Sequence, residues 1–238
     1  MSFWVHLALA SLWGGLLALE RRAFLQAMIS RPLVAATGTG FLLGDLEAGL
    51  FIGTVLELFY LDSAGMGASQ PENDTLSAVG TAAAAAGLGL DSGSPSTPAL
   101  WSAALLFFVG LGRAGRWMDR ALEGHSTRSW KRAVAELEAG ELRRAMRQNL
   151  WAMWPYFMLS AGVTAACAMA GVFMAQGLDF LPLRTVRGLA WAYPAMASVA
   201  AAVAVRGARV QGAVWYAALS ASAVILGTVL ASIVWGIA

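Results

Sequence analysis

Charged side chains are scarce in this chain of 238 residues. Asp, Glu, Lys and Arg make up 13% of it, whereas about 25% is usual in soluble domains. Apolar residues make up 58%, and the mean hydropathy is +0.64. This composition excludes an ordinary soluble domain and indicates an integral membrane protein.

Groups that carry chemistry are also few. The chain has one cysteine, Cys167, which excludes an intrachain disulfide or a thiolate metal site. Its two histidines, His6 and His125, stand apart from other candidate ligands, so neither metal binding nor acid-base catalysis is predicted. The sequence also shows no phosphate-binding P-loop. We therefore expect no cofactor and no catalytic residue in this chain.

The chain does contain long runs without any charged residue. A helix of about 20 apolar residues crosses a bilayer, and most of the runs approach or exceed that length. They cover residues 1–19, 75–90, 92–112, 148–178, 188–205 and 210–238. The sequence predicts an all-α polytopic membrane protein, a bundle of transmembrane helices that forms a single membrane domain over residues 1–238.

The positive charge is concentrated in one segment. Residues 113–148 hold nine of the 16 Lys and Arg residues, and by the positive-inside rule this basic loop faces the cytoplasm. Interspersed Glu residues and apolar residues at helical spacing favour an amphipathic helix there and give no support to nucleic-acid binding. The segment separates a charge-bearing part, residues 1–112, from longer and cleaner helices in residues 149–238.

Residues 32–61 do not fit one straight helix. Glycines punctuate the segment at positions 38, 40, 44, 49 and 53, and Asp45 and Glu47 interrupt its apolar run. Within a membrane, irregular backbone is tolerated only where protein or a watery cavity covers it. The pattern therefore predicts a broken or re-entrant helical hairpin that lines a site. Asp45 is expected either to cap the second helix or to contact a solute.

The ends of this hairpin carry further helix signals. Pro32 suits the first turn of a helix, and Arg31 before it is expected at the level of the lipid headgroups rather than on a substrate. Pro71 opens a short polar segment, residues 71–74, which we expect to be a turn or a re-entrant tip.

Glu57 is the most informative polar residue, because its neighbours on both sides are apolar. An ionised carboxylate at membrane depth costs at least about 2.5–3.5 kcal/mol on insertion scales unless water or a partner receives it. It is either a structural Glu, protonated or paired, or a carboxylate that hydrogen-bonds a polar solute, which is the hypothesis we favour. The amides of Gln26 and Asn73 can donate and accept, as sugar hydroxyls require, although Asn73 and Asp74 fit a turn equally well.

Several segments together resemble a known family. Their order and spacing are similar to those of the IIC membrane subunit of mannose/sorbose-class bacterial sugar phosphotransferase systems, and the close resemblance covers about the first third of the chain. The segments are Leu19-Glu-Arg-Arg22, Gln26-Ala-Met-Ile-Ser-Arg31-Pro32, Gly38-Thr-Gly40, Leu43-Gly44-Asp45, Gly49-Leu-Phe-Ile-Gly53, Leu56-Glu57-Leu58 and Gly65-Met-Gly67.

The resemblance implies a permease subunit of the bacterial cytoplasmic (inner) membrane that works beside a second membrane subunit, IID. The two would carry a hexose or amino sugar inward for phosphorylation by soluble IIA and IIB proteins, which would meet the cytoplasmic loop, and IIC-IID units are expected to form a homo-oligomer. Glu57 would bind the sugar, with Gln26 and the tip at residues 71–74 closing the site. The family tip reads Pro-Pro-Asp or Ala-Pro-Asp, so here either Asn73 replaces its Asp or Asp74 serves one position later.

Two alternatives stay open at this point. The chain could be a degenerate relative that acts as a membrane anchor or regulatory sensor without moving solute. An ion-coupled secondary transporter is a third possibility, because Glu57 alone does not exclude coupling to a proton or Na⁺.

Overall fold

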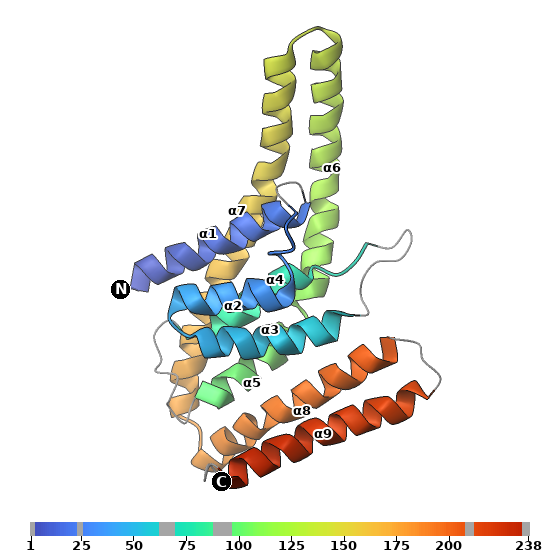
Figure 1. Ribbon diagram of the computed structural model, residues 1–238. Helices are drawn as coiled ribbons and strands as arrows, with labels where there is room; N and C mark the ends of the chain where they lie inside the picture. The colour runs from blue at the N-terminus through green and yellow to red at the C-terminus, as the bar shows by residue number, and fades with distance from the viewer. Residues whose placement is uncertain (1–2, 23–25, 62–69, 88–96, 208–211, 235–238) are drawn as a thin grey trace.

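The computed structural model describes residues 3–22, 26–61, 70–87, 97–207 and 212–234. Within these ranges every regular element is a helix, which confirms the all-α prediction (Figure 1). The helices are α1 (Phe3–Arg22), α2 (Pro32–Leu43), α3 (Leu46–Tyr60), α4 (Asp74–Ala85), α5 (Thr97–Phe108), α6 (Leu111–Glu138), α7 (Leu142–Asp179), α8 (Leu183–Gly207) and α9 (Ala213–Val234).

Three of the described helices, α1, α7 and α8, are long and apolar enough to cross a membrane. A fourth span arises if α5 and α6, which are bent by 41° at a short break, count as one. By contrast, α2 has 12 residues and is about 18 Å long, too short for a hydrocarbon core of about 30 Å. The bundle therefore combines long spans with short helices.

The short helices α2 and α3 form the predicted broken hairpin, and its sharp turn follows from two residues. Gly44 ends α2 with a φ of 82°, a left-handed conformation that glycine adopts without steric cost. Asp45 then caps α3, because its Oδ1 accepts a hydrogen bond of 2.9 Å from the amide of Ala48. The capping interpretation of Asp45 is confirmed.

Glycines also bring α2 and α3 into backbone contact. A Cβ on Gly40 would overlap the carbonyl of Asp45 and lie 2.7 Å from the Cα of Gly49. A Cβ on Gly53 would lie 2.9 Å from the carbonyl oxygen of Leu33. The glycine punctuation seen in the sequence therefore lets the two helices pack closely along the length of the hairpin.

Helix α4 occupies the centre of the bundle and consists largely of small residues. Its residues from Thr75 to Ala85 are all buried. The close approach to α7 leaves no room for a side chain at Gly171, whose Cβ would overlap the backbone of Ala84. Cys167 lies in the same contact, 3.1 Å from where a Cβ on Gly80 would be, and is buried.

The basic segment is helical, in agreement with the amphipathic helix that its sequence favours. Residues 113–138 lie in α6 and residues 142–148 in α7, joined by a turn in which Gly140 has a φ of 80°. At 28 and 38 residues, the two helices are about 42 and 57 Å long. Their paired ends project beyond the other helices (Figure 1). The expected boundaries at residues 112 and 149 therefore fall inside continuous helices.

Candidate functional site

Five helix ends converge at one end of the bundle: the ends of α1 and α3 and the beginnings of α2, α4 and α6 (Figure 1). Hydrogen bonds tie them together. The hydroxyl of Thr75 in α4 donates to the carbonyl of Ser30 before α2 at 2.8 Å, and the amide of Asn73 donates to the carbonyl of Gly112 in α6 at 2.9 Å. The polar residues near these five helix ends are thus gathered in one region, whereas Asp45 and Glu47 lie at the other end of the hairpin.

Glu20 fixes the segment that leads into α2. Its carboxylate is 5% exposed and accepts hydrogen bonds from the amides of Ile29 at 3.3 Å and Ser30 at 2.9 Å. These bonds satisfy partly buried backbone donors that lie outside any helix. The sequence showed Glu20 only as a charge at the end of a helix, and its role in holding the next segment was not predicted.

Glu57 lies beside the beginning of α2 and has two partners there. Its Oε1 forms an ion pair with Arg31, and its Oε2 accepts a hydrogen bond of 3.2 Å from the amide of Leu33. Pro32 occupies the first turn of α2, as predicted, and Arg31 in the N-cap position provides no side-chain cap. Glu57 therefore caps α2 from the neighbouring helix, where the positive end of the helix dipole favours a carboxylate.

Exposure differs between the two partners of this ion pair. The side chain of Glu57 is 20% exposed and that of Arg31 is 51% exposed. Glu57 is thus paired, which is one of the two states that the sequence left open. The ion pair of Arg31 with a protein partner was not predicted.

The tip at residues 71–74 precedes α4, and three of its residues are held by other side chains. Glu72 forms ion pairs with Arg113 at 3.2 Å and Arg116 at 3.6 Å. Asn73 caps α4, because its Oδ1 accepts a hydrogen bond of 3.0 Å from the amide of Leu76. Its Nδ2 donates to Asp119 at 3.1 Å. Asp74 forms an ion pair with Arg21 at 3.2 Å. Asn73 therefore caps a helix from the turn that the sequence allowed, and Asp74 is held by an ion pair that was not predicted. Pro71 is exposed at the beginning of the tip.

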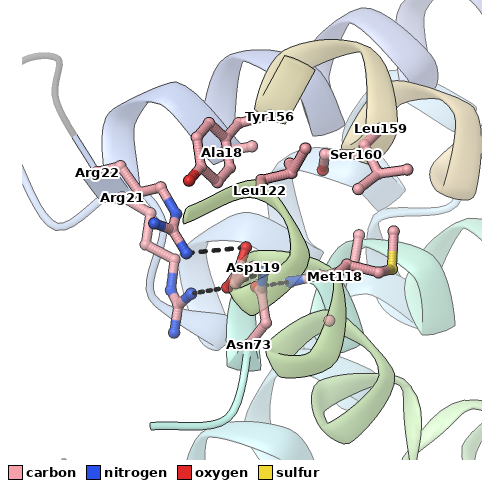
Figure 2. Close-up of a pocket in the computed structure, with 12 residues that line it drawn as sticks. Ala18, Arg21, Arg22, Asn73, Met118, Asp119, Leu122, Tyr156, Leu159 and Ser160 are labelled. Atoms are coloured by element: carbon pink, nitrogen blue, oxygen red, sulfur yellow. Dashed lines mark hydrogen bonds and ion pairs between the residues drawn. The ribbon is translucent and has the colours of Figure 1, made fainter. Parts of the chain in front are cut away.

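A buried carboxylate, Asp119 in α6, connects this tip to α1. It forms ion pairs with Arg21 at 3.3 Å and Arg22 at 2.9 Å and accepts the hydrogen bond from Asn73 (Figure 2). We call these four residues the Asp119 cluster. Arg22 also stacks on Tyr156 of α7, with its guanidinium carbon 4.3 Å from the ring centroid. The cluster therefore links α1, the tip, α6 and α7.

The hollow beside the Asp119 cluster is small. It has room of about 20 Å³, enough for about one water molecule. A wider hollow of about 360 Å³ adjoins it and shares Ala18, Arg22 and Tyr156 as lining residues. Of the two, only the wider hollow has a volume within the range of about 300–1,000 Å³ that is usual for small-molecule sites. Glu57 is not among the residues that line either hollow.

Among the described residues, no hydrogen bond or ion pair joins Gln26 to Glu57 or to the Asp119 cluster. It is exposed and has a φ of 47°, a left-handed conformation that is uncommon for residues other than glycine. Its proposed contact with sugar stays a prediction, as do those of Glu57, Asn73 and Asp74.

The described residues contain no group of three or more His, Cys, Asp or Glu side chains placed to hold a metal ion. The chemistry that the site offers is hydrogen bonding and ion pairing by carboxylate, guanidinium and amide groups. Such groups bind and orient a polar solute.

Comparison with solved structures supports the same architecture. One, described as "Structure of membrane protein", matches with a TM-score of 0.63 at 18% identity and covers 98% of this chain and 94% of its own. A chain of "CryoEM Structure of Mannose Transporter ManYZ and Microcin E492 (MceA) complex" matches with a TM-score of 0.58 at 18% identity, covering 97% of this chain and 94% of its own. At these identities the likeness concerns the fold.

A comparison with curated proteins found no match. A family model described as "PTS system sorbose-specific iic component" does match, over residues 4–233. The match extends far beyond the first third of the chain, where the resemblance was seen, and includes the projecting α6 and α7. The chain therefore belongs to the sorbose-specific IIC family and is a membrane component of the mannose/sorbose class of phosphotransferase systems.

Proposed function

We propose that this chain is the sugar permease subunit of a phosphoenolpyruvate-dependent phosphotransferase system in the bacterial cytoplasmic membrane. It pairs with a IID subunit, and together they bind a hexose or amino sugar and deliver it inward. Soluble IIA and IIB proteins then phosphorylate the sugar at the side that the basic α6 and α7 ends face. Family membership and the likeness in fold to a chain of a mannose transporter complex support this proposal.

The observation that carries the proposal is the position of Glu57. It lies on a glycine-packed broken hairpin, at the end of the bundle where helix ends meet, and its charge is balanced by Arg31 and by the beginning of α2. An ion pair with a half-exposed arginine contributes only about 0–1 kcal/mol, so a solute can displace the arginine at small cost. The carboxylate is thus held by Arg31 and the amide of Leu33 in the empty protein, and it becomes available to sugar hydroxyls when the pair opens.

The side chains of this chain indicate which subunits transfer the phosphoryl group and which move the sugar. Phosphoryl transfer needs an activated nucleophile or a phosphate cradle. The two histidines, His6 in α1 and His125 in α6, are separated in the chain and belong to no described group of potential ligands. We therefore assign transfer to IIA and IIB, and binding and translocation to this chain with IID.

Two variants separate a sugar-binding role of Glu57 from a structural one. Glu57→Gln keeps an acceptor for the amide of Leu33 but removes the charge, and Arg31→Gln breaks the same ion pair while leaving the carboxylate. Cells carrying this chain with IID, IIA and IIB would be given a panel of labelled hexoses and amino sugars. Uptake should require phosphoenolpyruvate, fall at least tenfold in Glu57→Gln and persist in Arg31→Gln, at equal amounts of protein in the membrane.

Equal loss of uptake in both variants would mean that the ion pair is structural. Unchanged uptake in Glu57→Gln would remove the carboxylate from the sugar path altogether.

One observation favours a second candidate, the non-transporting anchor or sensor. Arg31 and the amide of Leu33 already account for Glu57 without any solute, and Asn73 and Asp74 are likewise occupied by protein partners. This candidate predicts no uptake of any sugar in the panel by the wild-type protein, together with retained binding to IID in a pull-down.

A further inference from the structure

A hollow between α6 and α7 shares no lining residue with the two hollows beside the Asp119 cluster. It has a volume of about 450 Å³ and opens where the two helices leave the rest of the bundle. Three residues of α6 and three of α7 define its character: His125, Ser129, Arg132, Gln148, Trp151 and Trp154. One wall thus combines a cation with hydrogen-bonding groups, and the other is largely indole.

The position of the two tryptophans along α7 places this hollow at the membrane surface. Residues 148–178 contain no charged side chain and, as a helix, are about 46 Å long. A bilayer with its headgroup regions is about 40–45 Å thick, so the first two turns of this stretch reach headgroup depth. Trp151 and Trp154 lie there and are 62% and 52% exposed, as is typical of aromatic residues at a membrane interface.

The polar wall is suited to a phosphate group. Arg132 is exposed and brings a guanidinium to the hollow, and Arg guanidinium binds phosphate through charge-assisted hydrogen bonds. His125 contributes an Nε2 that is buried and has no hydrogen-bond partner among the described residues. Glu136, one turn beyond Arg132 on α6, is the nearby acid and does not line the hollow. Its Oε1 accepts a hydrogen bond of 3.4 Å from Gln148, and its buried Oε2 has no hydrogen-bond partner among the described residues.

The surrounding charge is positive on balance, although Glu138 and Glu141 lie at the same helix ends and Glu141 pairs with Arg144 at 3.9 Å. Arg143, Arg144 and Arg147 come directly before the uncharged stretch of α7, and Arg128 lies one turn from Arg132 on α6. Each basic residue near an anionic membrane surface contributes about 1 kcal/mol of attraction. Basic pockets between membrane helices on the cytoplasmic side are known places for anionic lipid headgroups.

We propose that this hollow binds the headgroup of an anionic phospholipid. The phosphate lies against Arg132 and the Nε2 of His125, and the glycerol and upper acyl chains lie against Trp151 and Trp154. The lipid would join the α6 and α7 ends to the membrane surface and so fix the direction in which they project. The inference does not depend on sugar transport, and it applies equally to a permease and to a membrane anchor.

The test is lipid retention by the purified full chain, measured by native mass spectrometry during titration with phosphatidylglycerol or phosphatidylcholine. A third arm adds inorganic phosphate. The variant Arg132→Gln removes the proposed contact. Its matched control is Lys131→Gln, which makes the same change in net charge at an exposed neighbouring position that does not line the hollow.

The wild-type protein should retain phosphatidylglycerol in preference to phosphatidylcholine. Its apparent Kd for phosphatidylglycerol should rise roughly tenfold in Arg132→Gln and stay unchanged in Lys131→Gln, since a hydrogen bond to a charged group is worth about tenfold or more in binding. The variant His125→Gln provides a second check and should also weaken retention, in case Arg132→Gln does not yield folded protein.

Three results would overturn the proposal. An equal rise in the apparent Kd for phosphatidylglycerol in Arg132→Gln and Lys131→Gln would show general attraction to the basic surface rather than a site. Equal retention of the two lipids would show that the headgroup charge is not recognised. Displacement of phosphatidylglycerol by millimolar inorganic phosphate would identify a free-anion site instead of a lipid site.

Discussion

Asp119→Asn tests whether the Asp119 cluster holds the helix ends together. The substitution keeps the shape of the side chain but removes the charge that balances Arg21 and Arg22. Breaking a buried ion pair costs about 3–5 kcal/mol. Here the cost is smaller, because Arg21 keeps Asp74 and the arginine side chains are 18% and 31% exposed to solvent. We expect a loss of about 2–3 kcal/mol.

For a chain of this size, 1 kcal/mol corresponds to about 2–4 °C in melting temperature. The apparent Tm of Asp119→Asn, measured by fluorescence-detected unfolding in detergent, should therefore fall by about 5–10 °C. Asp179→Asn is the control, because it makes the same chemical change at an exposed residue at the end of α7. An equal effect of the two substitutions would show that the cluster does not stabilise the fold.

The same unfolding measurement checks two further predictions. Gly40→Ala should destabilise the hairpin by about 1–3 kcal/mol, because its Cβ would overlap backbone atoms, whereas Gly162→Ala meets nothing within 4 Å and should be neutral or stabilising. The reverse order would contradict the close contact of α2 and α3. Asn73→Ala should cost about 1–2 kcal/mol, because it removes the cap of α4 and a bond to Asp119. No change in Tm would mean that neither bond contributes to stability.

Local signals in the sequence were sufficient for the hairpin. Gly44 and Asp45 interrupt an apolar run, and the structure uses them as the end of one helix and the cap of the next. Pro32 likewise marks the beginning of α2. These features are encoded within a few residues, so they can be inferred without knowledge of the tertiary structure.

Contacts between distant segments were not predictable in the same way. Asp119 sits among basic residues in the sequence, which hid its pairing with Arg21, 98 residues away. Glu20 similarly binds backbone amides of a later segment. Apolar spacing in residues 113–148 indicated helix there, but not that the segment would form the paired ends of two long helices, α6 and α7. Tertiary packing decides such cases.

The partners of Glu57 show the same limit. Its apolar neighbours in sequence identified it as unusual, and the alternatives of a paired or a solute-binding carboxylate were both visible. Only the structure shows that Arg31 and the beginning of α2 lie against it. The proposal therefore assigns both roles to one group: it is paired when the site is empty and binds sugar when the pair opens.

The most direct test is the binding of the transported sugar to the purified complex with IID, in the wild-type protein and in the two variants of the ion pair. A charged hydrogen bond is worth about 1.5–3 kcal/mol, so Glu57→Gln should raise the Kd roughly 10- to 100-fold. Arg31→Gln should leave the Kd unchanged or lower it by up to about fivefold, because no ion pair must be broken. A Kd in Glu57→Gln equal to that of the wild-type protein would contradict the account.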